Sequence, residues 1–264
     1  MTIILDGRKL NAEIVARLAR QIKRLKHKPK LVIVQVGSVP ESDKYIKRKK
    51  IFGEKIGAIV EHKKYPGNVL EQRLISEISK FNKSSSVHGI IVQLPLPKHL
   101  QNILGLIAEE KRVDGGKYFR PATAKGVLAL LDKYRIKITG KKAVVVGRSE
   151  LVGKPIALAL LEREATVTIC HKQTKDLKRE TKQAEILVVA AGSPELITKN
   201  HVSRDQIVID VGINILGNEK LVGDVDFKNV SKKVRAISPV PGGVGPMTVA
   251  SLFQNLLEAY ELQT

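Results

Sequence analysis

The chain has 264 residues, 43% of them hydrophobic, which suits two modest domains with buried cores and argues against a disordered protein. No apolar run approaches the roughly 20 residues of a membrane span, so we expect no membrane partner. Residues 2–5 lack the residue order of a secretory leader, and Cys170 is the only cysteine. A single thiol excludes an internal disulfide and suits a reducing compartment, so we expect a cytoplasmic protein.

The formal net charge of +20 raises nucleic acid as a partner. Its distribution argues against that reading, because lysines and arginines are scattered from Arg8 to Lys233, and only five tyrosines and five phenylalanines exist to stack on bases. We therefore expect solvated helix surfaces, anionic small-molecule ligands and no nucleic acid. A basic nucleic-acid-binding protein is the more distant alternative, and it predicts strongly salt-dependent binding.

The first half of the chain alternates helical and strand patterns. Apolar residues recur at helical spacing from Leu10 to Leu25, and further helix-period stretches precede the later strands. Buried strands are predicted over residues 31–36, 58–61 and 89–93. This order predicts an α/β domain with a mostly parallel sheet. The periodicity stops near residues 113–121, so we place the domains at 1–118 and 119–264.

The second half predicts a doubly wound, Rossmann-like parallel sheet. A helix over 123–134 crosses the boundary, and another is predicted over 152–162. The predicted strands lie at residues 142–146, 165–169, 186–189 and 207–211. The tail over 246–262 is amphipathic and is predicted to be a closing helix that packs back on the first domain.

A glycine-containing loop follows the strand that ends at Val146 and opens a helix. At such a junction, glycines permit a tight turn and let backbone N–H groups approach a pyrophosphate at the positive end of the helix dipole. Gly147 and Gly153 take these roles, while Ser149 stands where the usual fingerprint has its second glycine. The loop predicts a dinucleotide site, with an ordinary strand-to-helix turn as the alternative.

The next strand favours NADP over NAD. An NAD-preferring unit usually ends this strand with an acidic residue that binds the ribose hydroxyl, whereas here Lys172 follows it. Lys172 and Arg148 suit a 2′-phosphate. The alternative for Lys172 is a solvated surface lysine.

A lysine of the first domain is predicted to face inward. On a helix that starts near Pro40, Lys49 shares a narrow stripe with Tyr45, Phe52 and Ile56. A partly desolvated amine favours its neutral form and can accept a proton. The alternative is a lysine stem that covers apolar surface with its head in water.

Three further places suggest ligand contact. Gln93 ends a buried strand, where open α/β sheets bind their ligands, and it could hydrogen-bond a catalytic amine. Asp114 begins an Asp-Gly pair, which is otherwise a plain turn. Residues 239–248 carry so many conformational constraints before a helix that they predict a shaped wall against a ligand.

Taken together, these residues resemble the bifunctional methylenetetrahydrofolate dehydrogenase/methenyltetrahydrofolate cyclohydrolase family over nearly the whole chain. The shared motifs are Tyr45-Ile46-Lys47-Arg48-Lys49, Gly89-Ile90-Ile91-Val92-Gln93-Leu94-Pro95-Leu96-Pro97, Val113-Asp114-Gly115, Val146-Gly147-Arg148-Ser149, Asp210-Val211-Gly212-Ile213-Asn214 and residues 239–248.

The resemblance implies a site in a cleft between two α/β domains. It implies that Lys49 is the catalytic lysine, tuned by Gln93, that Tyr45 lines the folate site, and that Asp114 holds the pterin. It also implies that the turn formed by Pro241, Gly242 and Gly243 borders the substrate and the nicotinamide.

The resemblance further implies NADP as cofactor. Gly147, Arg148, Ser149 and Ile213 would contact it, with Lys172 at the 2′-phosphate. Tetrahydrofolate derivatives are the implied substrates, in one-carbon metabolism, and a homodimer is the implied assembly. The reaction would be oxidation of 5,10-methylenetetrahydrofolate to the methenyl cation, followed by hydrolysis to 10-formyltetrahydrofolate. Hydrolysis of a cation needs a placed water and a proton relay, and the six histidines show no paired ligand spacing, so no catalytic metal is expected.

One departure from the family pattern is the short segment after Asp114. Only Gly116 to Arg120 separate Gly115 from Pro121, and Ala122 and Ala124 stand where the family often has cysteine and proline. We expect altered substrate affinity or an altered ratio of the two activities. A monofunctional NADP-dependent dehydrogenase, on folate or another small anion, is the nearer alternative.

Overall fold

The computed structural model describes residues 2–217 and 220–264, and the chain forms two compact units. One, the three-stranded unit, contains Glu13–Ala122 and Val249–Thr264. The other, the six-stranded unit, contains the residues up to Ala12 together with Thr123–Thr248. The chain therefore passes from one unit to the other within α1 (Gly7–Lys23), at the start of α4 (Ala122–Lys133) and within α8 (Val244–Gln263).

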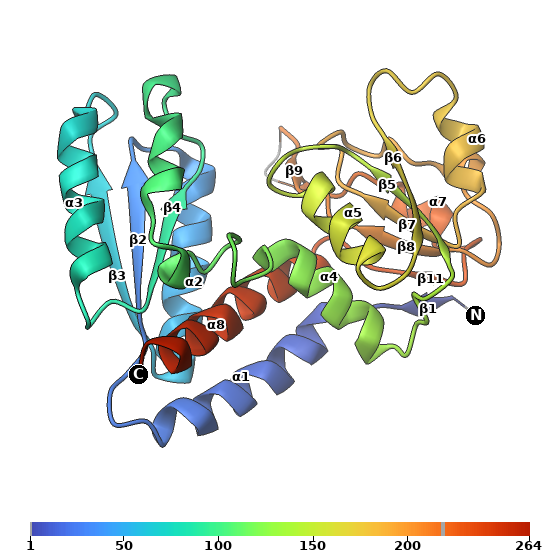
Figure 1. The fold of residues 1–264 in the computed structure, drawn as a ribbon. Helices are drawn as coiled ribbons and strands as arrows, with labels where there is room; N and C mark the ends of the chain where they lie inside the picture. Colours follow the sequence, from blue (N-terminus) through green and yellow to red (C-terminus); the bar gives the residue numbers. More distant parts are fainter. Residues whose placement is uncertain (1, 218–219) are drawn as a thin grey trace. The chain divides into compact units, whose positions relative to one another are not determined.

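The three-stranded unit has a parallel sheet in the order β3-β2-β4. Its strands are β2 (Lys30–Val36), β3 (Ile59–Tyr65) and β4 (Gly89–Gln93), close to the predicted ones. One face packs against α3 (Glu71–Lys83) and the 3-10 segment η1 (Lys98–Leu106), where Val32 and Val34 join Leu74 and Leu100 in a buried cluster. Helix α2 (Pro40–Ile56) lies on the other side of the strands in Figure 1.

Local sequence features set the ends of α2, and a tertiary contact holds it against α8. Proline stands in its first turn, where its missing N–H costs nothing, and Gly57 ends it with φ 80°, a conformation that glycine adopts readily. Phe52 on α2 stacks on Phe253 of α8 with ring centroids 4.9 Å apart. At the end of α8, Gln263 donates to the carbonyl oxygen of His88 at 2.9 Å. The last helix thus completes the core of this unit.

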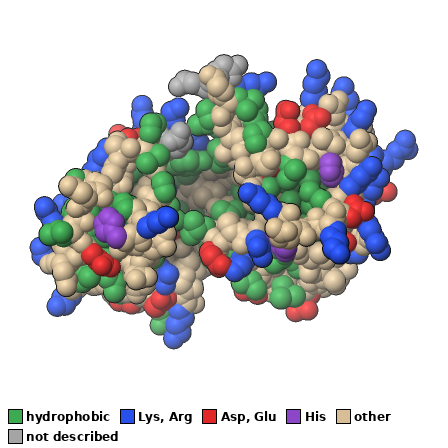
Figure 2. Space-filling view, turned by 90° about the horizontal axis from the view of Figure 1, so that it is seen from above, with side chains coloured by type: hydrophobic (Ala, Val, Ile, Leu, Met, Phe, Trp, Pro, Cys, Tyr) green, Lys and Arg blue, Asp and Glu red, His purple; other side chains and the backbone are tan. Residues whose placement is uncertain are grey.

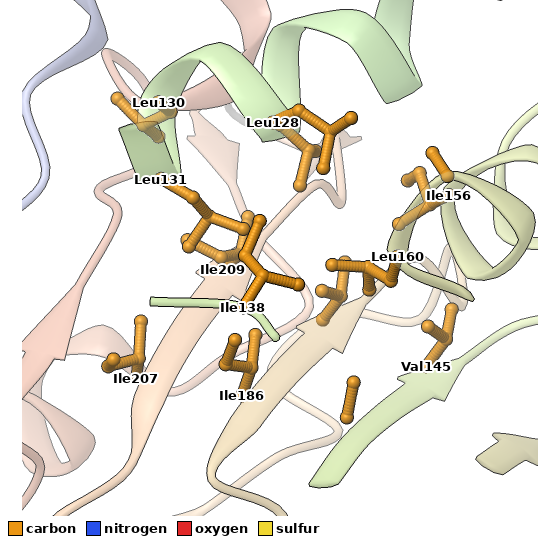
Figure 3. Packing of buried hydrophobic residues seen from close by; sticks show 14 of the residues in the cluster. Leu128, Leu130, Leu131, Ile138, Val145, Ile156, Leu160, Ile186, Ile207 and Ile209 are labelled. Carbon is orange, nitrogen blue, oxygen red and sulfur yellow. The ribbon is translucent and has the colours of Figure 1, made fainter. Parts of the chain in front are cut away.

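The six-stranded unit has a parallel sheet in the order β1-β11-β8-β7-β5-β6. Its main strands are β5 (Lys142–Val146), β6 (Thr166–Cys170), β7 (Ile186–Val189) and β8 (Ile207–Asp210). On one face, α4 and α5 (Gly153–Leu161) contribute residues such as Leu131 and Leu160 to a buried cluster that also contains Val145 (Figure 3). Val144 and Leu187 point to the other face, into a cluster with Ile197 and Val230. These two layers confirm the predicted doubly wound sheet.

The remaining elements of this unit are short. They are α6 (Leu177–Lys182), α7 (Phe227–Val230), η3 (Lys199–His201) and the antiparallel pair β9 (Asn214–Ile215) and β10 (Leu221–Val222). In the three-stranded unit, η2 spans Glu109–Lys111.

The start of the chain differs from the expected domain at 1–118. Strand β1 (Ile3–Ile4) pairs with β11 (Ala236–Ile237) at the edge of the six-stranded sheet, so the first residues belong to that sheet. A two-residue strand shows no periodicity, and its partner lies more than 230 residues away, so the sequence pattern gives no sign of the pairing.

Two surface properties bear on possible partners. Among the described residues, no helix has both the length and the apolar character to span a bilayer. On the face shown in Figure 2, lysine and arginine side chains are interspersed with acidic and apolar ones over both units.

Candidate active site

Lys49 and Gln93 meet between α2 and the carboxyl end of β4. The Lys49 Nζ donates to Gln93 Oε1 at 2.7 Å. Gln93 Nε2 donates to the carbonyl oxygen of Leu94 at 3.1 Å, and the same oxygen accepts from Ser42 Oγ at 2.9 Å. Because the amide nitrogen is engaged on one side, the amide oxygen faces the lysine. Gln93 thus holds the amine in one position without adding a charge.

The inward stripe of α2 is present as predicted. Phe52 and Ile56 are buried, Tyr45 and Lys49 are partly buried, and Lys47 is exposed. Burial lowers the pKa of Lys49 to about 8, while the negative charge of Asp114 acts in the opposite direction. Near neutral pH, an appreciable fraction of this amine is therefore neutral and able to accept a proton.

Tyr45 is one helical turn before Lys49 on the same side of α2. Burial raises the pKa of the Tyr45 hydroxyl, and the nearby positive charge of Arg48 only partly offsets this effect. The Arg48 guanidinium lies 5.7 Å from the centroid of the Tyr45 ring. The phenol therefore stays protonated, which suits packing and hydrogen bonding rather than acid–base chemistry.

Asp114 is exposed and fixes the start of a helix. Its Oδ1 accepts from the backbone N–H of Ala122, the first residue of α4, at 2.8 Å. The short segment between them is closed by Asn255 of α8, whose Nδ2 donates to the carbonyl oxygens of Val113 at 2.8 Å and Arg120 at 2.9 Å. Sequence reasoning missed Asn255. The sequence signal that could have identified Asn255 is an amide side chain within an otherwise apolar helical stripe.

The loop after β5 requires glycine at both predicted positions. Gly147 has φ 121°, and a Cβ there would lie 2.1 Å from the carbonyl oxygen of Ala190, beyond the end of β7. A Cβ on Gly153 would lie 2.2 Å from the carbonyl oxygen of Gly147. Ser149 Oγ accepts from the backbone N–H groups of Val152 and Gly153 at 3.3 Å each. The serine thus stabilises the first turn of α5.

The two predicted phosphate contacts follow neighbouring strands. Val146 at the end of β5 is the register partner of Cys170 at the end of β6. Arg148 and Lys172 each stand two residues beyond this pair, and both side chains are exposed. Two cations beside one glycine turn, at the carboxyl edge of the sheet, fit the additional phosphate of a phosphorylated dinucleotide.

Ile213 lies in a loop that two buried carboxylates hold. It follows β8 and is 39% exposed, so its side chain is available to a ligand. Asp210 and Asp224 are buried beside this loop, and sequence reasoning assigned them no role. Their partners are mostly backbone N–H groups brought together by the fold, together with the side chain of Asn214, and a sequence pattern does not show such contacts.

The turn of Pro241, Gly242 and Gly243 touches the start of α1. Gly7 N–H donates to the carbonyl oxygen of Gly242 at 2.9 Å, and a Cβ on Gly7 would lie 1.9 Å from the carbonyl oxygen of Gly243. Gly242 has φ 120°, and Arg8 Nη2 donates to the carbonyl oxygen of Pro241 at 3.3 Å. The turn is thus built from closely packed backbone.

Within residues 2–217 and 220–264, no three histidine, cysteine, aspartate or glutamate side chains gather closely enough to hold a metal ion.

The two domains of one known protein family match the two halves of the chain. Residues 5–114 match the catalytic domain of tetrahydrofolate dehydrogenase/cyclohydrolase, and residues 121–264 match its NAD(P)-binding domain. The chain belongs to the tetrahydrofolate dehydrogenase/cyclohydrolase family. The bifunctional protein FolD of Moorella thermoacetica is 46% identical over 273 positions, which cover 97% of this chain and 98% of the relative.

Solved structures of the tetrahydrofolate dehydrogenase/cyclohydrolase family share the fold. The FolD enzyme from Campylobacter jejuni has a TM-score of 0.97 and 40% identity, with 100% of both chains covered. The Trypanosoma brucei FolD, solved with NADP and an inhibitor, has a TM-score of 0.93 and 31% identity and covers 99% of this chain and 98% of its own. The Lys49–Gln93 pair therefore lies in the family's catalytic domain, and the Gly147 loop in its NAD(P)-binding domain.

Proposed function

We propose that this protein oxidises 5,10-methylenetetrahydrofolate with NADP⁺ and hydrolyses the resulting 5,10-methenyl cation to 10-formyltetrahydrofolate. The observation that carries the proposal is the Lys49–Gln93 hydrogen bond at the end of β4, in a chain of this family. The test is to assay purified protein for both steps, following NADPH absorbance in the first and loss of the methenyl cation in the second. Oxidation without hydrolysis would favour the monofunctional alternative. Two family-typical activities with unaltered folate affinity would contradict an effect of the short segment after Asp114.

In the first step, the bound cofactor supplies the acceptor for the hydride that leaves the methylene carbon. This step moves no proton, so the protein needs to orient the substrate and the cofactor but needs no general base. Asp114 would accept hydrogen bonds from the pterin, and Tyr45 would pack along the folate. The turn of Pro241, Gly242 and Gly243 borders the ligands of the first step.

In the second step, the neutral amine of Lys49 accepts a proton from water as the new carbon–oxygen bond forms. Breakage of the bond between this carbon and N5 then needs a proton at N5, and one proton is released overall. Gln93 keeps the Lys49 amine in place through both transfers. The surplus of basic residues suits the polyanionic ligands.

Asp in place of Lys172 is expected to weaken NADP⁺ binding far more than NAD⁺ binding. The substitution removes a cation beside the glycine loop and places a negative charge where the 2′-phosphate would lie. We expect the KM for NADP⁺ to rise at least about tenfold, equivalent to roughly 1.4 kcal/mol, with a much smaller change for NAD⁺. Steady-state kinetics with both cofactors provide the measurement.

Lys175→Asp is the matched control for Lys172→Asp. Lys175 is also exposed, and its substitution makes the same charge change three residues away. It is expected to leave the ratio of the two KM values nearly unchanged. Equal losses for both cofactors in Lys172→Asp would remove Lys172 from the phosphate site.

The proposal includes a cytoplasmic homodimer that forms through the β6 edge of the six-stranded sheet. Strand β6 ends the sheet, and such an edge is normally covered or protected. Ile169 on β6 is 40% exposed, and Leu158 and Leu161 on the neighbouring α5 are 58% and 56% exposed. An apolar strip at an open sheet edge suits a second copy of the same surface.

Glu in place of Leu158 is expected to convert the dimer to monomers, because a charge would be buried at the centre of the contact. The mass from light scattering during gel filtration should fall by half. Leu262→Glu is the control, since Leu262 is 54% exposed on α8 in the other unit. An unchanged dimer in Leu158→Glu would place the contact elsewhere.

A further inference from the structure

Asp224 is a fully buried carboxylate whose hydrogen bonds converge from two loops of the six-stranded unit. Its Oδ2 accepts from the backbone N–H groups of Ala191 at 2.6 Å and Gly192 at 2.9 Å. Its Oδ1 accepts from the backbone N–H of Ser193 and from Asn214 Nδ2, both at 2.9 Å. Four donors thus fill both oxygens, and three of them are successive backbone N–H groups wrapped around the charge.

The first of these loops, residues 190–193, stands beside the cofactor loop. It follows β7, which pairs with β5, and the order of the sheet reverses between these two strands. Open α/β sheets bind their ligands at such a point. Gly147 has no room for a Cβ because the carbonyl oxygen of Ala190 is there. A displacement of the 190–193 loop would therefore change the space around Gly147.

The second loop, residues 212–214, carries Ile213 and is held from both ends. Asn214 is tied to Asp224, and the N–H of Gly212 donates to Asp210 Oδ1 at 3.0 Å. Asp210 also positions Asp224 itself, because it accepts from the backbone N–H groups of Asp224 and Val225 at 3.0 Å each. The two carboxylates thus form one buried unit.

Two glycines make room for this carboxylate pair. A Cβ on Gly212 would lie 2.2 Å from Asp224 Cγ, and a Cβ on Gly223 would lie 1.9 Å from Asp210 Oδ2. Both carboxyl groups therefore pack directly against bare backbone. Any side chain at either glycine would therefore displace a carboxyl group.

We propose that Asp224 is a positioning residue for the dinucleotide: its carboxylate fixes the 190–193 loop and the 212–214 loop as two walls of the cofactor site beside Gly147. The inference rests on the proposed function, since it presumes that this site binds NADP. Asp210 supports it by holding the backbone at Asp224. Neither residue touches the reacting atoms, so the effect is on cofactor affinity rather than on proton transfer.

The test is Asp224→Asn, measured by the Kd for NADP⁺ and by both activities. Asparagine keeps one acceptor oxygen but replaces the other with an NH₂ group, which cannot accept hydrogen bonds from the two donors that meet it. We expect the Kd for NADP⁺ to rise about tenfold or more, because hydrogen bonds to a buried charge are among the stronger ones. Methenyl hydrolysis uses no cofactor, and its proposed residues Lys49 and Gln93 lie in the other unit. Its kcat/KM is expected to stay within about twofold of wild type.

The exchange Asn214→Asp with Asp224→Asn is expected to recover part of the lost affinity, because an amide again donates to a carboxylate between these positions. If Asp224→Asn does not fold, Asn214→Ala gives a milder version that removes one donor and keeps the charge, with an expected loss of about threefold to tenfold. Asp226→Asn is the matched control. Asp226 caps α7 through the backbone N–H of Asn229 at 3.3 Å, so it is expected to affect Tm and not the Kd.

A lower Tm with an unchanged Kd for NADP⁺ in both Asp224→Asn and Asn214→Ala would overturn the inference, because the contacts would then be structural only. A parallel loss of both activities in Asp224→Asn would also overturn it. A wild-type protein that neither binds nor reduces NADP⁺ would contradict the proposed function itself. If wild type binds NADP⁺ and Asp224→Asn binds it with equal affinity, this inference is refuted and the proposed function is not.

Discussion

Lys49→Met is expected to lower the rate of methenyl hydrolysis about a hundredfold to ten-thousandfold, the usual range for loss of a positioned general base. The dehydrogenase step transfers a hydride and no proton, so it is expected to lose much less. Methionine matches the length of the lysine stem and packs well against Tyr45 and Phe52. Assays of both steps on the same preparation give the measurement.

The wild-type pH profile tests the same assignment. The pKa of Lys49 is lowered to about 8, so the neutral amine declines below that pH. Hydrolysis kcat/KM should therefore fall about tenfold per pH unit below 8 and level off above it. Asp114 raises the pKa of Lys49, so Asp114→Asn is expected to move this profile to lower pH.

Stability provides a check on Lys49→Met. A lysine with a lowered pKa in the folded state disfavours folding while it is charged, and this cost disappears only as the pH rises from about 8 towards the unfolded value. Methionine removes that cost, so the variant should be at least as stable as wild type at pH 7. Lys47→Met makes the same change at an exposed position and should retain both activities. Intact hydrolysis in Lys49→Met would refute the mechanism.

Gly147→Ala is expected to abolish measurable NADP⁺ binding. The methyl group would lie 2.1 Å from the carbonyl oxygen of Ala190, and φ 121° is a conformation that alanine rarely adopts. Even in cores that can yield, an inserted methyl group costs about 1–3 kcal/mol, and here it meets rigid backbone. The two loops must therefore separate. Binding titrations and Tm together give the measurement.

Gly140→Ala is the control for Gly147→Ala. Gly140 also has a positive φ, of 74°, but a Cβ there meets nothing within 4 Å. This variant isolates the cost of backbone strain, about 1 kcal/mol, and should bind NADP⁺ normally. Methenyl hydrolysis should survive in both variants. If Gly147→Ala bound NADP⁺ as tightly as wild type, the glycine loop would not be the cofactor site.

Much of the fold and part of the candidate site could be predicted from the sequence. The long strands and helices have clear periodicity, and the helical stripe around Lys49 indicated which lysine of a dense cationic run turns inward. Gln93 was predicted from its place at a strand end, and the structure joins it to Lys49.

The missed features share a physical cause. Asn255 donates to carbonyl groups of Val113 and Arg120, and three of the four donors to Asp224 are N–H groups of residues 191–193, so most of these partners are distant backbone atoms. Backbone groups carry no residue identity, and a sequence pattern cannot show which of them a buried side chain meets. Strand β1 was missed for a related reason, since two residues are too few for a period.

Each of the two units combines an early and a late segment of the chain, and this arrangement affects folding during synthesis. The first strand of the six-stranded sheet pairs with β11, and Phe52 of the three-stranded unit stacks on Phe253 of the last helix. Both partners are synthesised after the other strands of their units. Neither unit can therefore reach its full set of contacts on a partial chain, and non-local contacts of this kind slow folding. Both units of the nascent chain therefore stay incomplete until α8 is made.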